Sequence, residues 1–407
     1  IMPSLVGSEM CIRDRLEITP ELLNPEGATY SWLVNGKEYS TEPTFSYKID
    51  NPCRADLTCI IKNKYGKVEM STSFSSNHNF SKGFFYVADG TFNFYDTEKK
   101  TAYQDCYASL NAGKTLGIGN YDSANIIHSN GKFYLLVGTS TSNRDHFYIV
   151  DAKTLYYENS AVVGANLSGL TILNEQYGLV TGDGIRRIDL KSLNNVRIKN
   201  ERLLCFYNSI IYNGKVLSND TYKDESKVKY YDVNELIAAK EGEAPAVTEL
   251  DIIQKQKINF VLAKDGNVYT LESADNGCNI VKIKNDFTLE KVFANFQPAK
   301  GPYHSSPTIG MVASETENII YLVSTDGAIY KYILGDSDSL KAPFIAAESG
   351  VSITAPLQLN QQSGELYVTY TEELKDESKI VVYSKDGKVL HTVDCGESVP
   401  SQILFNN

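Results

Sequence analysis

The chain has 407 residues, which is too long for one small hydrophobic core, so more than one domain is expected. Its formal net charge of −11 disfavours nucleic-acid binding, because phosphate contacts require clustered Lys and Arg side chains. The 27 Tyr and 28 Gly residues, against 4 Met and 1 Trp, are typical of an all-β protein. No run of about 18 apolar residues occurs, so no transmembrane segment is predicted.

The first fifteen residues, IMPSLVGSEMCIRDR, have the pattern of neither a secretory signal nor a β-domain. The run from Met10 to Arg15 resembles the translation of an adapter used to prepare sequencing libraries. We therefore interpret residues 1–15 as a non-native segment. The native N-terminus, with any signal peptide or lipoprotein cysteine, is expected to lie outside the printed sequence.

Residues 16–76 are predicted to form a small β-sandwich. Trp32 lies in an apolar run that ends at Asn35-Gly36, a dipeptide typical of tight hairpin turns. The segments SWLVNGK and NKYGK resemble those of PKD-like, immunoglobulin-like modules. In such sandwiches a single Trp belongs to the core more often than it forms a carbohydrate-stacking platform, so Trp32 is expected to be buried. Cys53 and Cys59 either form a disulfide or remain small apolar thiols, and the second alternative is favoured.

Residues 77–82 are short and polar and are predicted to link the sandwich to a repeat region, residues 83–407. The repeat is a β-hairpin, and its clearest copy runs from Asn318 to Leu334 around the turn Asp326-Gly327. A period of about 40 to 50 residues is typical of propeller blades. Six further copies are found at residues 84–96, 132–151, 176–189, 215–232, 259–284 and 365–386.

An apolar strand precedes most of the hairpins, as NIIHSNG does before Lys132, but the first hairpin starts abruptly at Gly83 without one. The C-terminal segment SVPSQILFNN, residues 398–407, has the sequence of such a strand. We predict that it joins the first blade, because a ring that joins its first and last elements has no open sheet edge. The predicted fold is all-β, an immunoglobulin-like sandwich followed by a closed β-propeller of about seven blades, or six if residues 215–232 are an insertion.

Several hairpins end in an aromatic or Ile-rich strand followed by Asp, as in FYD at 94–96, YIVD at 148–151 and YYDV at 230–233. These endings resemble those of YncE-like propellers. A PKD-like module followed by such a propeller is similar to surface lipoproteins of Gram-negative gut bacteria, including propellers that capture cobalamin on an outer-membrane transporter. The resemblance implies an exported, lipid-anchored outer-membrane protein, with cobalamin or another small ligand and a transporter as partners.

Motifs of hydrolases, metalloproteases and nucleotide-binding enzymes are missing: the sequence has no HExxH, GxSxG or P-loop pattern. We therefore expect a non-enzymatic protein without cofactor or metal. The rival prediction is a propeller lyase or lactonase, which requires His and acidic side chains near the channel mouth. His128 and His304 are its candidates, because each flanks a predicted innermost strand, although both are expected to be ordinary polar loop residues.

The predicted binding site is the rim of the central channel. In a propeller, the loops between second and third strands lie on the same face as the loops that enter the innermost strands. Tyr, His and charged residues around this funnel suit a large amphipathic ligand or a protein partner. The competing function is a structural or adhesive scaffold of the cell envelope, in which Tyr only covers blade edges. The predicted rim residues are Asp89, Tyr121, Arg144, Asp183, Tyr207, Tyr222, Tyr303, His304, Asp326 and Glu373.

Overall fold

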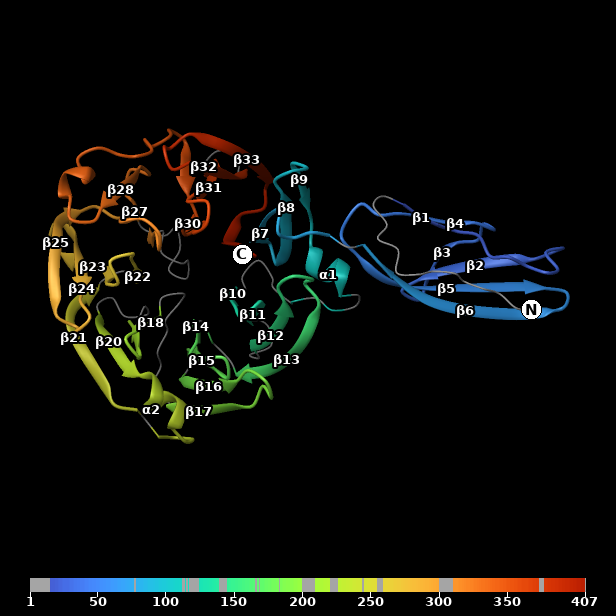
Figure 1. Cartoon of the computed structure of the whole chain (residues 1–407), viewed down its shortest axis with the longest axis horizontal. Helices are drawn as coiled ribbons and strands as arrows, with labels where there is room; N and C mark the ends of the chain where they lie inside the picture. Colours follow the sequence, from blue (N-terminus) through green and yellow to red (C-terminus); the bar gives the residue numbers. More distant parts are fainter. Residues whose placement is uncertain are drawn as a thin grey trace.

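The computed structural model describes residues 15–76, 78–111, 114, 116, 124–138, 145–164, 167, 169–182, 184–199, 209–219, 226–243, 245–254, 259–299, 310–372 and 377–406. These residues form two units, an elongated β-sandwich and a ring of sheets around a centre (Figure 1). Strands make up 57% and helices 4% of the structure, so the fold is all-β as predicted. In the ranges just given, no helix has the length and apolar character needed to cross a membrane.

The N-terminal sandwich contains β1 (Arg15–Ile18), β2 (Thr29–Val34), β3 (Lys37–Ser40), β4 (Phe45–Lys48), β5 (Arg54–Asn63) and β6 (Gly66–Ser75). β1 pairs with β4, and the other sheet has the order β3-β2-β5-β6. Trp32 on β2 is fully buried and packs on Phe45 of β4, with the ring centroids 5.2 Å apart. Its indole N–H donates to the Glu42 carbonyl at 2.9 Å. Trp32 is therefore a core residue that joins the two sheets, as expected.

Cys53 and Cys59 are both free thiols. Cys53 directly precedes β5 and Cys59 lies within it, so about six residues of extended chain hold their Cα atoms roughly 20 Å apart. A disulfide requires a separation below about 7 Å. Burial also raises the pKa of Cys59 to about 11, which keeps its thiol protonated. Strand geometry thus decides between the two alternatives for this pair in favour of free thiols.

Seven sheets follow one another around the ring, and their first strands β10, β14, β18 and β22 lie nearest the centre in Figure 1. Short helices α1 (Cys106–Leu110), α2 (Val233–Ala238) and η1 (Ser337–Leu340) occupy connections. The first sheet contains β34 (Pro400–Leu404), β7 (Gly83–Ala88), β8 (Thr91–Asp96) and β9 (Thr101–Tyr103), and the second contains β10 (Ala124–Ser129), β11 (Lys132–Val137), β12 (Asp145–Asp151) and β13 (Tyr157–Gly164). The third contains β14 (Gly169–Ile172), β15 (Tyr177–Thr181), β16 (Ile185–Asp189) and β17 (Asn195–Lys199), the fourth β18 (Ile210–Tyr212), β19 (Lys215–Ser218), β20 (Ser226–Asp232) and β21 (Val247–Gln254), and the fifth β22 (Val261–Leu262), β23 (Val268–Ala274), β24 (Gly277–Ile283) and β25 (Leu289–Phe296). The sixth contains β26 (Met311–Ala313), β27 (Ile319–Val323) and β28 (Ile329–Ile333), and the seventh β29 (Val351–Ile353), β30 (Gln358–Leu359), β31 (Leu366–Glu372), β32 (Ser378–Tyr383) and β33 (Val389–Gly396).

The first sheet combines the two ends of the repeat region, in the order β34-β7-β8-β9. β34 runs antiparallel to β7, with Ile403 opposite Tyr86 and Leu404 opposite Phe85. The C-terminal segment therefore takes the place that the first strand has in the other sheets, and the predicted pairing with the first hairpin is present. Residues 215–232 belong to a four-stranded sheet of their own and are not an insertion in another sheet.

The Asp that recurs at the end of the third strands closes the turn that follows. Asp96, Asp151, Asp189 and Asp232 end β8, β12, β16 and β20, and each carboxylate accepts hydrogen bonds from the N–H groups two and three residues further on. At Asp189 the bond from the Ser192 N–H is 2.7 Å long and is the main cause of the lowered pKa of this carboxyl. A side chain that satisfies two turn N–H groups explains why Asp recurs here.

The segment between the two units is anchored to both of them. Phe80 is buried and lies 5.2 Å from the ring of Phe85, and the His78 ring lies 4.6 Å from that of Tyr103. On the sandwich side, the Cys53 N–H donates to the Ser76 hydroxyl at 2.7 Å, and the Ser76 N–H donates to the Cys53 carbonyl at 2.8 Å. The polar sequence of residues 77–82 thus contains one buried ring, that of Phe80, and one half-buried ring, that of His78, and their packing limits motion between sandwich and ring.

Candidate functional site

Two of the predicted rim residues, Asp89 and Asp326, lie in the described part of the chain. Each occupies the turn between the second and third strands of its sheet, β7–β8 and β27–β28. The Asp326 carboxylate accepts from the Ser324 hydroxyl and, at 3.2 Å, from the Ala328 N–H, and these bonds lower its pKa. Asp326 therefore closes its own turn. The other eight predicted residues fall outside the described residues: Tyr121, Arg144, Asp183, Tyr207, Tyr222, Tyr303, His304 and Glu373.

A hydrogen-bonded polar network spans the fourth, fifth and sixth sheets at the base of this face. The Asn219 amide donates to the Gln254 side-chain carbonyl, and Gln254 donates to the Thr270 hydroxyl at 2.9 Å. The Thr270 hydroxyl donates to the Asn259 carbonyl at 3.0 Å. The Asn259 side chain then accepts from the Met311 N–H at 3.0 Å and donates to the Met311 carbonyl at 2.6 Å. Three neighbouring sheets are thus joined by side chains.

The network holds residues at the ends of three connecting segments. Asn219 directly precedes residues 220–225, Gln254 and Asn259 flank residues 255–258, and Met311 follows the segment that ends at residue 309. Gly310 packs closely against this network, because a Cβ atom there would lie 2.1 Å from the Asn259 Oδ1 and would displace the Asn259 side chain from its hydrogen bonds to Met311. The segments that carry Tyr222, Tyr303 and His304 therefore begin or end on a rigid base.

Two further side chains link neighbouring sheets. Gln402 on β34 accepts from the Ile126 N–H of β10 at 3.2 Å and donates to the Ile126 carbonyl at 2.7 Å. Asp145, buried at the start of β12, accepts from the Leu167 N–H ahead of β14 at 2.5 Å. Sequence reasoning missed these residues because their partners are distant in the chain. The one available signal is a polar residue within an apolar strand, as in the SQILF segment around Gln402.

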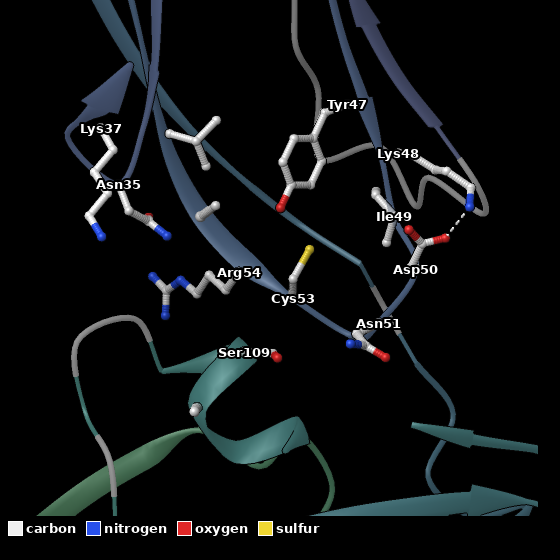
Figure 2. Close-up of a pocket in the computed structure, with 13 residues that line it drawn as sticks. Asn35, Lys37, Tyr47, Lys48, Ile49, Asp50, Asn51, Cys53, Arg54 and Ser109 are labelled. Atoms are coloured by element: carbon white, nitrogen blue, oxygen red, sulfur yellow. Dashed lines mark ion pairs between the residues drawn. The ribbon is translucent and has the colours of Figure 1, made fainter. Parts of the chain in front are cut away.

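A second candidate site lies between the sandwich and the ring, where sequence reasoning placed none (Figure 2). It is a cleft of about 600 Å³, a volume in the range of small-molecule sites. The sandwich supplies most of its walls, and α1 of the ring supplies the rest. Its lining residues are Val34, Asn35, Lys37, Tyr47, Lys48, Ile49, Asp50, Asn51, Cys53, Arg54, Ala55, Ala108 and Ser109.

Basic side chains dominate this cleft. Lys48 forms an ion pair with Asp50 at 2.5 Å, the one acidic residue of the lining. The Arg54 guanidinium lies 5.1 Å from the ring centroid of Tyr156, which belongs to the propeller, so Arg54 connects the two units. Burial raises the pKa of the Cys53 thiol, which keeps it protonated and weakly nucleophilic at neutral pH. The cleft is therefore suited to binding rather than to thiol chemistry.

A smaller cleft of about 250 Å³ adjoins the first and shares Asn35 and Arg54 with it. Its ring-side wall contains Lys114, whose ammonium lies 3.6 Å from the ring centroid of Tyr157. Asn111 fixes this wall, because its amide donates to the Leu155 carbonyl at 2.8 Å and its carbonyl accepts from the Tyr157 N–H at 2.7 Å. The two clefts form one basic region at the domain junction.

Metal binding requires clustered ligand side chains, and a propeller lyase would use His128, the one of its two candidate His residues that the structure describes. Among the described residues, no group of three or more His, Cys, Asp or Glu side chains is placed to hold a metal ion. His128 sits near the β10–β11 turn, at the opposite end of β10 from the segment that enters it, and its ring lies 5.1 Å from that of Phe133. Burial lowers its pKa, so it packs as a neutral ring. His304 lies outside the described residues.

Residues 80–406 match a domain of unknown function, DUF5074. The chain belongs to the DUF5074 family. In this DUF5074 protein, residues 8–63 also match a PKD-like domain, as predicted from the SWLVNGK and NKYGK segments. Among curated proteins, none matches the sequence.

Several solved structures are similar to this DUF5074 protein. A crystal structure from Bacteroides thetaiotaomicron, named a quinonprotein alcohol dehydrogenase-like protein, is 95% identical, covers 100% of this chain and 99% of its own, and has a TM-score of 0.94. A functionally unknown protein from Desulfotomaculum acetoxidans is 12% identical over 80% of this chain and 99% of its own, with a TM-score of 0.51. A beta-propeller domain from Myceliophteria thermophila is 12% identical over 67% of this chain and 89% of its own, with a TM-score of 0.43. Because the Bacteroides thetaiotaomicron structure matches the whole chain, sandwich and ring are arranged alike in that protein and in this one.

Proposed function

We propose that this DUF5074 protein is a non-enzymatic binding protein of the bacterial surface, built on a closed propeller of seven blades. The seven sheets and the pairing of β34 with β7 support the closed ring. The proposed role is capture of a ligand in the funnel, or docking of the funnel on an outer-membrane transporter.

The polar network from Asn219 to Met311 carries the binding proposal. It fixes the ends of connecting segments from three sheets on one face, and binding sites are commonly loops held by a rigid scaffold. Cobalamin or a related corrinoid is the specific candidate ligand, from the resemblance to cobalamin-capturing propellers. The alternative is a scaffold of the cell envelope that binds no small molecule.

A titration separates the two functions. Purified protein is titrated with cobalamin and cobinamide in a calorimeter, and we expect nanomolar binding that is lost in the double variant Tyr303→Ala, His304→Ala. Tyr65→Ala is the matched control, because Tyr65 is a highly exposed Tyr on the sandwich. If no binding is seen at ~100 μM, the binding free energy is weaker than about 5.5 kcal/mol. That result would contradict ligand capture and favour the scaffold function.

The proposed location is the outer-membrane surface, with a lipid anchor. The resemblance to PKD-propeller lipoproteins supports it. The genomic sequence upstream of the Leu16 codon is the test. A signal peptide with a lipoprotein cysteine is the expected result, and a start codon directly before Leu16 would refute it.

A further inference from the structure

The basic cleft at the domain junction shares no residue with the predicted rim of the funnel. We propose that it takes a small organic anion, one that carries a phosphate or a carboxylate group, and holds it between the sandwich and the ring. The cleft is built from both units: β5 and its neighbours form one wall, and α1 forms the other. A solved structure that is 95% identical over the whole chain is similar in overall arrangement, with a TM-score of 0.94.

The charge of the lining selects for an anion. The lining contains three basic side chains, Lys37, Lys48 and Arg54, and one carboxylate, that of Asp50, which is paired with Lys48. Neither Lys37 nor Arg54 has an ion pair within the described residues, and Arg54 is held by the Tyr156 ring instead. An excess of positive charge in a chain of net charge −11 attracts anions to this point of the surface.

Hydrogen-bond donors converge on the same part of the cleft. Figure 2 shows the nitrogen-bearing ends of Lys37, Asn35 and Arg54 on one side of the opening. Asn35 sits in the β2–β3 turn with a left-handed φ of 48°, and its Oδ1 accepts from the Asp56 N–H at 2.9 Å. This bond fixes the side chain and leaves the amide N–H₂ for a ligand. The planar guanidinium of Arg54 suits the two oxygens of a phosphate or a carboxylate.

The cleft is larger than an inorganic ion needs. Its volume of about 600 Å³ leaves room for an organic body, and Val34, Ile49 and Tyr47 supply apolar surface for it. Ser109 on α1 adds a hydroxyl from the ring side. A ligand that contacts Arg54 and Ser109 together would therefore bridge the two units.

The test is a calorimetric titration of the full chain with three probes that share one sugar ring: glucose 6-phosphate, glucuronate and glucose. We expect one or both anions to bind and neutral glucose not to bind, and the stronger of the two anions identifies the preferred group. Arg54→Gln and, separately, Lys37→Gln should each weaken binding by about tenfold or more, because each removes a charged donor. Lys64→Gln is the matched control, because Lys64 is an exposed lysine of the sandwich that is absent from the cleft lining.

Lys37→Gln also guards against a structural explanation. Arg54 contacts Tyr156 across the junction, so its loss can change the domain arrangement, whereas Lys37 has no such contact among the described residues. Small-angle scattering of each variant reports that arrangement directly. The proposal is overturned if neither anion binds at concentrations up to about 10 mM. It is also overturned if glucose binds as tightly as the anions, or if Lys37→Gln and Arg54→Gln bind them as the control does.

Discussion

Removal of the C-terminal strand tests how the ring is held together. Deleting residues 398–407 removes β34, so β7 loses its antiparallel partner and the sheet of β7, β8 and β9 loses its first strand. Phe85 and Tyr86, which are buried opposite Leu404 and Ile403, would become exposed on the free edge of β7.

The expected loss can be worked from the contacts. Ile403 is 2% and Leu404 7% exposed, and burial of each such side chain stabilises the fold by about 1.5 to 3 kcal/mol. The two hydrogen bonds of Gln402 to Ile126 add about 0.5 to 1.5 kcal/mol each. The sum, about 4 to 9 kcal/mol, is comparable with the whole stability of a typical domain, about 5 to 15 kcal/mol.

Urea unfolding of the full and the truncated chain, followed by circular dichroism, measures this difference. A synthetic peptide of residues 398–407 added in trans should restore part of the lost stability, because it can pair with β7. Ile403→Ala is the graded control and should cost about 2 to 4 kcal/mol. If the truncated chain unfolds at the same urea concentration as the full chain, the assignment of β34 as a stabilising strand is wrong.

Three further changes probe other parts of the molecule. Gly310→Ala should destabilise the ring by about 1 to 3 kcal/mol in urea unfolding, since its Cβ would lie 2.1 Å from the Asn259 Oδ1; an unchanged midpoint would contradict that packing. Asp189→Asn should cost about 0.5 to 1 kcal/mol of unfolding free energy at pH 7, because it weakens hydrogen bonds to the turn at a carboxylate that solvent partly screens. Because the folded pKa of Asp189 is lowered, this difference is present above about pH 4 and shrinks as the pH falls through the folded value, whereas a pH-independent difference would refute the turn-closing role. Trp32→Ala should destabilise the sandwich by about 3 to 5 kcal/mol while the ligand binding proposed for the funnel is retained, and loss of that binding would show that the funnel depends on the sandwich.

The hairpins could be predicted because their signals are local. An apolar run, a Gly-containing turn and a second apolar run lie within about 15 residues, as around Asp326-Gly327, and the register follows from that turn. The role of residues 398–407 was also predictable, since a first hairpin without an inner strand requires one from elsewhere. The recurring Asp was visible as a pattern, but its function as a turn-closing acceptor depends on where the N–H groups of the turn lie, which the sequence does not specify.

The polar network from Asn219 to Met311 and the cleft at the domain junction could not be predicted, because both depend on contacts between segments that are distant in the sequence. Asn259 bonds to Met311, 52 residues away, and nothing in the intervening sequence marks the pair. Likewise, Phe80 and His78 sit in a segment that has the composition of a flexible linker, yet their rings are packed against the first sheet. The cleft around Arg54 follows from that packing, which sets the orientation of the sandwich.

The side-chain amides of Gln402 and Asn259 act as substitutes for peptide groups. Each exchanges one donated and one accepted hydrogen bond with a single backbone residue of the adjacent sheet, as two paired strands do. Where these contacts occur, opening one sheet leaves polar backbone groups of its neighbour unsatisfied, so adjacent sheets are expected to unfold as one cooperative unit. Amide hydrogen exchange at Ile126 and Met311 would therefore report the opening of two sheets at once rather than the fraying of one.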